Sequence, residues 1–302
     1  MKKFICAVLF FASFLSFSLK AQTAGNTGLT FLKIGFGARN ISMGDIGTVS
    51  ANDVSALFYN PAYFAESNST ELFFSHNQWI QDVRSEIFGA SISVLGIPLA
   101  FGINTTTVSD IEIRTMPGQA DAKFNASYFA GSISTGFHLT ENISFGATAK
   151  YLYEGLLADE ANGLGFDFGA IYKTPLEGLN LGAVVRNLGS MNELRKQATK
   201  LPTDIRFGAA YNYDLININS VLNLGAEFQK YTGSDESHVN LGAEIIYEDM
   251  VSLRAGYQQG FENRGFSAGL GIKWYNLGFD YAVTPFSLDF GTSHTISIKF
   301  KF

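Results

Sequence analysis

The chain has 302 residues and a formal net charge of −6, and only 16% of its residues are charged, against about 25% in an ordinary soluble domain. Gly (31) and Phe (28) are abundant, which excludes a disordered chain, because such chains combine low hydrophobicity with high charge. The acidic balance offers no basic patch and argues against nucleic acid as a partner. The single cysteine, Cys6, excludes a disulfide framework.

Residues 1–21 are predicted to be a secretory signal peptide. Lys2 and Lys3 form a positive start, Phe4–Phe17 is an apolar run broken only by small residues, and Ala21 is a small residue at the expected cleavage point. A single membrane anchor is the alternative, but the run is shorter than the ~20 residues that a helical span needs. We therefore expect an exported chain that starts at Gln22.

Residues 22–66 are too rich in Gly and polar residues to form membrane strands. Asn52–Tyr59 is predicted to form a short helix with Asp53 as its N-cap, and Asn60-Pro61 ends it, because proline disfavours helix at the preceding residue. Irregular backbone survives at membrane depth only where protein or water surrounds it. We therefore expect a plug inside a barrel, with Arg39 paired to a carboxylate of the wall. A flap outside the barrel is the alternative.

Residues 67–302 show a repeated alternation of apolar and polar side chains, which is clearest at the C-terminus, where Ile298 and Phe300 alternate with Ser297 and Lys299. A period of two predicts strands with one apolar face. Fourteen such runs are centred near Phe73, Ala90, Gly102, Ala130, Ala147, Phe168, Ala183, Phe207, Leu224, Ala243, Leu253, Leu270, Phe279 and Ile298. The even number is typical of up-and-down barrels, so the predicted fold is an all-β, antiparallel transmembrane barrel of the outer membrane.

The connections between these runs alternate in length, which is also typical of transmembrane barrels. The short ones are Leu95–Ile97, His138–Asn142, Glu248–Met250 and Trp274–Asn276; the long ones are Asp110–Phe124, Glu154–Asn162, Leu188–Leu201, Lys230–Ser237 and Thr284–Thr292. In such barrels the short turns are periplasmic and the long loops extracellular.

The two faces of the strands differ in a way that favours a barrel over a soluble β-sandwich, in which alternation also occurs. The apolar face is rich in Phe, Tyr and Leu, as contact with lipid requires, and Tyr and Trp recur near strand ends as a girdle would; these are Trp79, Tyr151, Tyr172, Tyr211, Tyr213, Tyr247, Tyr257 and Trp274. The polar face carries charges that would point into the lumen: Lys150, Asp167, Arg186, Arg206, Glu227, Glu244, Arg254, Lys273 and Asp280.

These lumen charges have two interpretations. A buried ion without a partner costs several kcal/mol, so the charges could form an ionic network that braces the wall or holds the plug through Arg39, Asp45 and Asp53. Alternatively, they could line a selective pore. We favour the network, because a plug would occupy the lumen.

Several stretches resemble the PorV/PorQ-type proteins within the FadL-like group of outer-membrane barrels. The opening signature is Phe31–Asp45 followed by Asn52–Ala62, and later matches are Gly163–Lys173, Asn187–Gly189 and Leu201–Tyr211. The residues that carry the plug signature are Phe31, Gly37, Arg39, Met43, Gly44, Asp53, Asn60 and Pro61. The resemblance implies a fourteen-stranded barrel with an N-terminal plug, which agrees with the strand count.

The resemblance also implies a function in type IX protein secretion in Bacteroidota. It suggests a non-enzymatic binding or scaffold protein that meets secretion-machinery proteins or secreted cargo through extracellular loops, such as Leu188–Leu201 with Arg195, Lys196 and Lys200. The alternative is a FadL-like transporter for hydrophobic small molecules. That function requires an apolar pocket beside the plug, for which Phe31, Leu32, Phe36 and Met43 are the candidates.

The sequence offers no catalytic, metal or cofactor motif. His76, His138, His238 and His294 lie in no metal-binding spacing, and His76 and His294 each follow a serine that points to the opposite face of its strand, so neither pair can act as base and nucleophile. The stretch Gly35–Asn40 lacks the third glycine and the βαβ unit of a nucleotide site. We therefore expect no enzyme activity, metal or cofactor.

Overall fold

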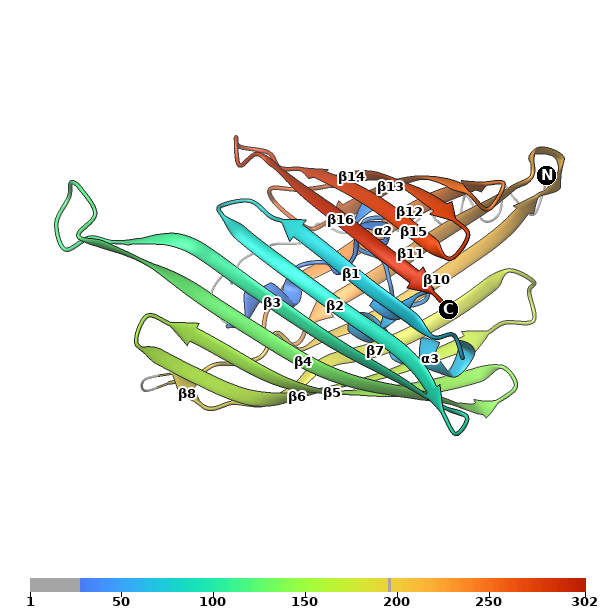
Figure 1. Ribbon diagram of the computed structural model, residues 1–302, viewed down its shortest axis with the longest axis horizontal. Helices are drawn as coiled ribbons and strands as arrows, with labels where there is room; N and C mark the ends of the chain where they lie inside the picture. Colours follow the sequence, from blue (N-terminus) through green and yellow to red (C-terminus); the bar gives the residue numbers. More distant parts are fainter. Residues whose placement is uncertain (1–27, 195–196) are drawn as a thin grey trace.

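The computed structural model describes residues 28–194 and 197–302, and the predicted signal peptide, residues 1–21, lies outside them. Fourteen antiparallel strands form a closed barrel in which the first strand pairs with the last, as Figure 1 shows. Each predicted strand centre falls in one of these strands, which confirms the predicted fold. The wall consists of β1 (Glu71–Gln78), β2 (Val83–Val94), β3 (Ile97–Ile113), β4 (Ala122–Thr140), β5 (Ile143–Leu156), β6 (Asp159–Lys173), β7 (Leu179–Met191), β10 (Asp204–Leu215), β11 (Ser220–Tyr231), β12 (Ser237–Tyr247), β13 (Val251–Gln259), β14 (Phe266–Trp274), β15 (Leu277–Pro285) and β16 (Thr292–Lys301).

The alternation of the sequence sets the two faces of the wall. On β16, Ile298 is 42% exposed on the outer face while Ser297 is 1% exposed in the lumen. Across the closure, Phe74 lies opposite Ile298 and is 44% exposed, whereas Phe73 is buried in the interior. Large apolar side chains on the outer face recur all round the wall, and so extensive an apolar surface is stable only against lipid. The barrel therefore spans a membrane.

The connections alternate as predicted, with one correction. Short turns such as Leu95–Gly96 and Tyr275–Asn276 lie at one end, and the connections at the other end include Arg114–Asp121, Gly260–Gly265 and a loop that contains the small hairpin β8 (Glu193–Leu194) and β9 (Gln197–Ala198). The prediction of a long loop over Glu154–Asn162 is wrong. β5 and β6 continue as a paired ladder and leave only a two-residue turn, because paired strands above the membrane do not need apolar outer residues.

The N-terminal segment, residues 28–66, lies inside the barrel, where Figure 1 shows it in blue between the strands. It contains η1 (Thr30–Lys33), α2 (Ala38–Ser42), η2 (Val54–Phe58) and α3 (Tyr63–Glu66). Asp53 caps η2, as predicted, by accepting a hydrogen bond of 2.9 Å from the backbone N–H of Ser55. None of the described helices is long and apolar enough to cross a membrane.

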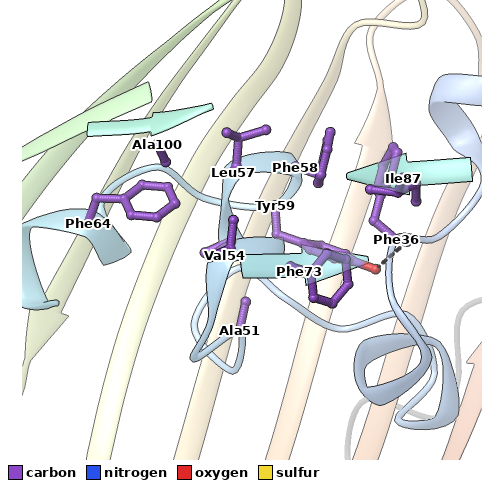
Figure 2. Close-up of a cluster of buried hydrophobic side chains, with 11 residues drawn as sticks. Phe36, Ala51, Val54, Leu57, Phe58, Tyr59, Phe64, Phe73, Ile87 and Ala100 are labelled. Atoms are coloured by element: carbon purple, nitrogen blue, oxygen red, sulfur yellow. Dashed lines mark hydrogen bonds between the residues drawn. The ribbon is translucent and has the colours of Figure 1, made fainter. Parts of the chain in front are cut away.

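A hydrophobic core joins the N-terminal segment to the wall. Phe36 stacks on Phe58 with ring centroids 4.7 Å apart, and its backbone N–H donates a hydrogen bond of 2.9 Å to the hydroxyl of Tyr59. Phe73, Ile87 and Ala100 of β1–β3 pack against this group. Figure 2 shows these side chains pointing toward one another from the segment and the wall. The barrel interior is thus a packed core at this level rather than an open channel.

Candidate functional site

Inward-facing glycines form a belt around the lumen where the N-terminal segment meets the wall. This glycine belt consists of Gly89, Gly102, Gly136, Gly146, Gly169, Gly182, Gly208, Gly225, Gly242, Gly256 and Gly269. A Cβ atom at Gly146 would lie 2.2 Å from the carbonyl carbon of Pro61, and one at Gly256 would lie 1.9 Å from the backbone nitrogen of Gly44. The segment therefore approaches the wall backbone more closely than any side chain would permit.

The contacts of the segment reach all fourteen wall strands. Eleven of these strands, β2–β7 and β10–β14, each contribute one glycine of the belt. Of the other three, β1 contributes Phe73 against Gly37, β15 contributes Ala282 to a cluster with Ala38 and Ile41, and Ser297 of β16 accepts a hydrogen bond of 2.8 Å from the backbone N–H of Ala38. Such contacts on every side hold the segment across the whole width of the lumen.

Residues of the plug signature make several of these contacts. Gly44 has a φ of +75°, and a side chain there would strike the carbonyl oxygen of Leu241 at 2.6 Å. Asn60 donates from Nδ2 to the carbonyl oxygen of Thr48 (2.7 Å) and to that of Ala170 in the wall (3.2 Å). Phe31 stacks on the wall residue Tyr128 with ring centroids 5.4 Å apart. The signature thus consists of residues that contact the wall or shape the backbone beside it.

Arg39 joins the segment to a wall carboxylate, as the sequence predicts. Its Nη2 lies 2.6 Å from Oε2 of Glu244, and its Nη1 donates to the carbonyl oxygen of Ser50 at 2.6 Å. Glu244 also accepts a hydrogen bond of 2.6 Å from Nε of Arg254, whose Nη1 lies 2.7 Å from Asp280. This row of alternating charges compensates four buried ions.

A second buried network lies on the adjacent wall. Arg206 pairs with Asp204 and with Glu227, each at 2.8 Å. The second carboxylate oxygen of Glu227 accepts hydrogen bonds from the backbone N–H groups of Gly47 (3.0 Å) and Thr48 (2.9 Å). The wall charges therefore bind the backbone of the segment as well as each other, which supports the ionic network over a selective pore.

Asp45 and Asp53, two acids of the N-terminal segment, have opposite electrostatic surroundings. Burial raises the pKa of Asp53, but Lys299, 3.4 Å away, and the hydrogen bond from Ser55 outweigh it, so the pKa lies below its usual value. Burial raises the pKa of Asp45 although Arg206 lies 4.0 Å away. Asp45 also accepts a hydrogen bond of 2.5 Å from the Tyr59 hydroxyl.

The other expected lumen charges divide into two groups. Lys150 and Asp167 form a buried pair at 2.6 Å, and Arg186 pairs with Asp204 at 2.8 Å and donates to the carbonyl oxygen of Phe58 at 2.8 Å. Lys273 does not belong to the buried lumen. Its side chain is 52% exposed and pairs with Asp249 in the adjacent turn, because its inward position falls beyond the end of the packed interior.

A pocket of about 290 Å³ opens at the end of the barrel that carries the long loops. We call it the mouth pocket. Its apolar lining includes Phe31, Ile34, Trp79, Val83, Val108 and Tyr128, and its charged lining consists of Lys33 and Arg264. The size is at the lower end of the range for small-molecule sites, and such sites combine apolar walls with a few polar groups. The mouth pocket is therefore suited to one small molecule with a large apolar surface.

A second cavity of only about 10 Å³ lies deeper along β3 and β4, lined by Leu32, Phe36 and Phe58 together with polar wall side chains. It has room for about one water molecule. Of the four candidates for an apolar pocket, Phe31 lines the mouth pocket, and Leu32 and Phe36 line this inner cavity. Met43 lines neither; it is buried against Gly242 and Gly256 of the belt.

Two residues of the mouth pocket were not expected from the sequence. The sequence predicts Trp79 to belong to a lipid-facing girdle, but it lies in the β1–β2 turn and lines the pocket. Its ring packs edge-on against that of Phe286, with ring centroids 5.1 Å apart. Arg264 lies in the β13–β14 loop beside Glu262 and Asn263, a polar sequence that is typical of a solvent-exposed loop. The only sequence signal for the mouth pocket is a tryptophan that directly follows a short predicted strand. Among residues 28–194 and 197–302, no group of three or more His, Cys, Asp or Glu side chains is arranged to hold a metal ion.

Comparisons with known proteins identify the fold. No protein-family model matches the sequence, and no curated protein matches it. The crystal structure of the Pseudomonas putida toluene transporter TodX is similar, with a TM-score of 0.63 and 12% identity over 88% of this chain and 98% of TodX. The CymD monoaromatic hydrocarbon channel gives a TM-score of 0.57 and 13% identity over 91% of this chain and 97% of CymD.

These similarities concern the fold alone, and they do not single out the PorV/PorQ type. Together with the apolar side chains on the outer face of the wall, the fold identifies the chain as a β-barrel of the outer membrane. The end with the long loops, and with it the mouth pocket, is then the extracellular end.

Proposed function

We propose that the protein is a non-enzymatic transporter that binds small hydrophobic molecules in the mouth pocket and passes them across the outer membrane. The observation that carries the proposal is the pocket itself. About 290 Å³ of mainly apolar space opens toward the outside in a lumen that is otherwise filled. A packed lumen does not suit a pore for water-soluble solutes, whereas an aromatic pocket suits a ligand that leaves water readily.

Two further observations support this proposal. The inner cavity continues the line of the mouth pocket along β3 and β4, since Thr106 and Tyr128 line the first and Asn104 and Ala130 line the second. In addition, the structures with a similar fold are a toluene transporter and a monoaromatic hydrocarbon channel by name. An uncharged ligand of that size would fit the pocket.

Toluene binding and uptake test the proposal. Val83 lines the mouth pocket, and Val94 on the same strand is 42% exposed on the outer face, so V83F and V94F form a matched pair. We expect toluene to bind to the purified protein in lipid nanodiscs and to enter cells that carry the protein faster than cells that lack it. V83F should lower both, and V94F should lower neither. Equal effects of the two variants, or uptake that is independent of the protein, would refute the proposal.

A scaffold function in type IX secretion is the second proposal, and it rests on the sequence resemblance over Phe31–Phe302. The surface that it would use is the β7–β10 loop with its β8–β9 hairpin; Arg195 and Lys196 of that loop lie outside the described residues. A pull-down from native outer membranes tests it. Stoichiometric capture of secretion-machinery proteins or secreted cargo would favour this function, and a protein recovered without them would count against it.

A further inference from the structure

Arg264 occupies an unusual position at the edge of the mouth pocket. Its guanidinium carbon lies 4.1 Å from the ring centroid of Phe261 and 5.0 Å from that of Trp79. Phe261 in turn stacks on His238, with ring centroids 3.8 Å apart and an interplanar angle of 6°. The guanidinium therefore lies over two aromatic rings that are themselves packed against other rings. These ring contacts, rather than a close ion pair, surround its guanidinium.

The other interior arginines differ from Arg264 because each has a carboxylate partner. Arg39, Arg186, Arg206 and Arg254 each pair with a carboxylate at 2.6–2.8 Å. Among the described residues, no carboxylate lies within 4.0 Å of Arg264 and no group accepts a hydrogen bond from its guanidinium. The residues outside the described part, 1–27 and 195–196, include no Asp or Glu. The acid that acts on Arg264 is Asp45, but only from beyond 4.0 Å, and Asp45 already lies 4.0 Å from Arg206 and accepts a hydrogen bond from Tyr59.

A partly buried cation without a close ion-pair partner is costly, and burial lowers the pKa of Arg264 below its usual value although Asp45 acts in the opposite direction. The two flanking rings leave the N–H edge of the guanidinium as the part that can still donate. That edge fits a planar carboxylate, which can accept two parallel hydrogen bonds. The other cation of the pocket, Lys33, is already paired with Glu236 at 3.1 Å, so Arg264 is the pocket cation that remains available to bind an anionic ligand.

The rest of the pocket favours a flat ring over a flexible chain. Phe31 and Tyr128 are stacked with an interplanar angle of 28°, and the ring of Trp79, which also lines the pocket, lies against Arg264. Aromatic side chains prefer offset-stacked or edge-on contacts with other rings. A single aromatic ring can make such contacts while a carboxylate attached to it reaches Arg264.

We propose that the preferred ligands of the mouth pocket are small aromatic acids, with the ring against Phe31, Tyr128 and Trp79 and the carboxylate on Arg264. This inference rests on the proposed function in the same pocket and narrows its substrate class. It distinguishes the protein from a channel that binds neutral hydrocarbons and aromatic acids equally well.

The experiment compares three probes of similar size: benzoate, toluene and hexanoate. The chain has two tryptophans, and Trp274 is 68% exposed on the outer face, so W274F leaves Trp79 as the reporter. Quenching of its fluorescence is titrated with each probe in nanodiscs, for W274F alone and combined with R264Q. The matched control is R114Q, which removes an arginine of the exposed β3–β4 loop. Heat-dependent migration on gels verifies that every variant is folded.

We expect benzoate to bind about 10–100-fold more tightly than toluene, as one or two charge-assisted hydrogen bonds would give, and more tightly than hexanoate. R264Q should weaken benzoate binding and abolish its preference over toluene, whereas R114Q should change neither the affinity for benzoate nor that preference. If toluene binds as tightly as benzoate, or R264Q leaves benzoate binding unchanged, the inference is wrong while the proposed function stands. Equal binding of hexanoate and benzoate overturns the preference for a ring. If none of the probes binds, both the inference and the proposed function fail.

Discussion

The glycine belt gives the most direct test of how the N-terminal segment is held. In the variant Gly146→Ala, the new methyl carbon would lie 2.2 Å from the carbonyl carbon of Pro61 and 2.4 Å from the nitrogen of Ala62. Carbon atoms normally stay about 3.5 Å apart, so the segment or β5 must shift by about 1 Å. Both obstacles are backbone atoms, which cannot rotate away as a side chain would.

The expected magnitude is the difference between two effects. Alanine restricts the unfolded chain and would by itself stabilise the fold by about 0.4–1 kcal/mol. Overpacking of a tight interior costs about 1–3 kcal/mol. The net expectation for Gly146→Ala is a loss of about 1–2 kcal/mol in the free energy of unfolding, together with a partly displaced segment.

The matched control is Gly131→Ala on the neighbouring strand. A methyl group at Gly131 would meet only the ring of Phe129, at 3.2 Å, and a ring can move. Urea unfolding in lipid vesicles measures stability, and ion conductance in planar bilayers reports displacement of the segment. Gly146→Ala should lower stability and raise conductance, and Gly131→Ala should do neither. If the two variants behave alike, the belt does not hold the segment.

Three further predictions concern the wall, the short-turn end and the segment as a whole. Ile298→Arg places a charge on the lipid face and should cost about 2–4 kcal/mol, whereas Lys301→Ser, on the other face of the same strand and with a side chain that is 64% exposed, should cost far less; equal losses in urea unfolding would show that the strand phase is wrong. Burial opposes ionisation of Glu66, but hydrogen bonds from Lys173 and a serine outweigh it and lower its pKa from 4.5. Its stabilising effect should therefore be complete above pH 4.5 and fade as the pH falls further, and Glu66→Gln should show less acid destabilisation in melting curves at pH 7 and pH 3; an identical acid response would contradict this. Deletion of Gln22–Ala65 should leave a barrel that inserts and conducts ions in planar bilayers, while the intact protein conducts little; large channels from the intact protein would refute a plugged lumen.

The lipid-facing pattern explains why the wall was predictable. Each strand must present apolar side chains at every second position over the thickness of the membrane, so the alternation carries both the number of strands and their phase. Where strands rise above the membrane, this constraint ends. Glu154–Asn162 therefore looked like a loop although it continues the β5–β6 ladder, and Lys273 looked like a lumen charge although it lies at the exposed rim.

The binding features were harder to predict because they depend on which distant parts meet. Inward glycines such as Gly225 and Gly256 stood out on the polar face, but their purpose depends on the backbone that lies against them. Arg264 sits in a polar loop, and only the fold brings it between Phe261 and Trp79. Arg39, by contrast, was predictable, since a buried cation in a segment inside a charged lumen needs an acid from the wall.

The contacts divide the N-terminal segment into two parts that differ in how firmly they are held. From Gly37 to Glu66, the glycine belt, the Arg39–Glu244 pair and the Glu227 hydrogen bonds oppose any movement. From Gly28 to Phe36, the polar contacts are fewer: a backbone hydrogen bond from Gly28 to Lys200, the partly buried Lys33–Glu236 pair and the hydrogen bond from Phe36 to Tyr59. This second part also contributes residues to both cavities. For the proposed transport, a ligand that moves from the mouth pocket toward the inner cavity therefore meets its lowest barrier along this part, beside β3 and β4, whereas passage farther toward the periplasm requires the contacts of the glycine belt to open.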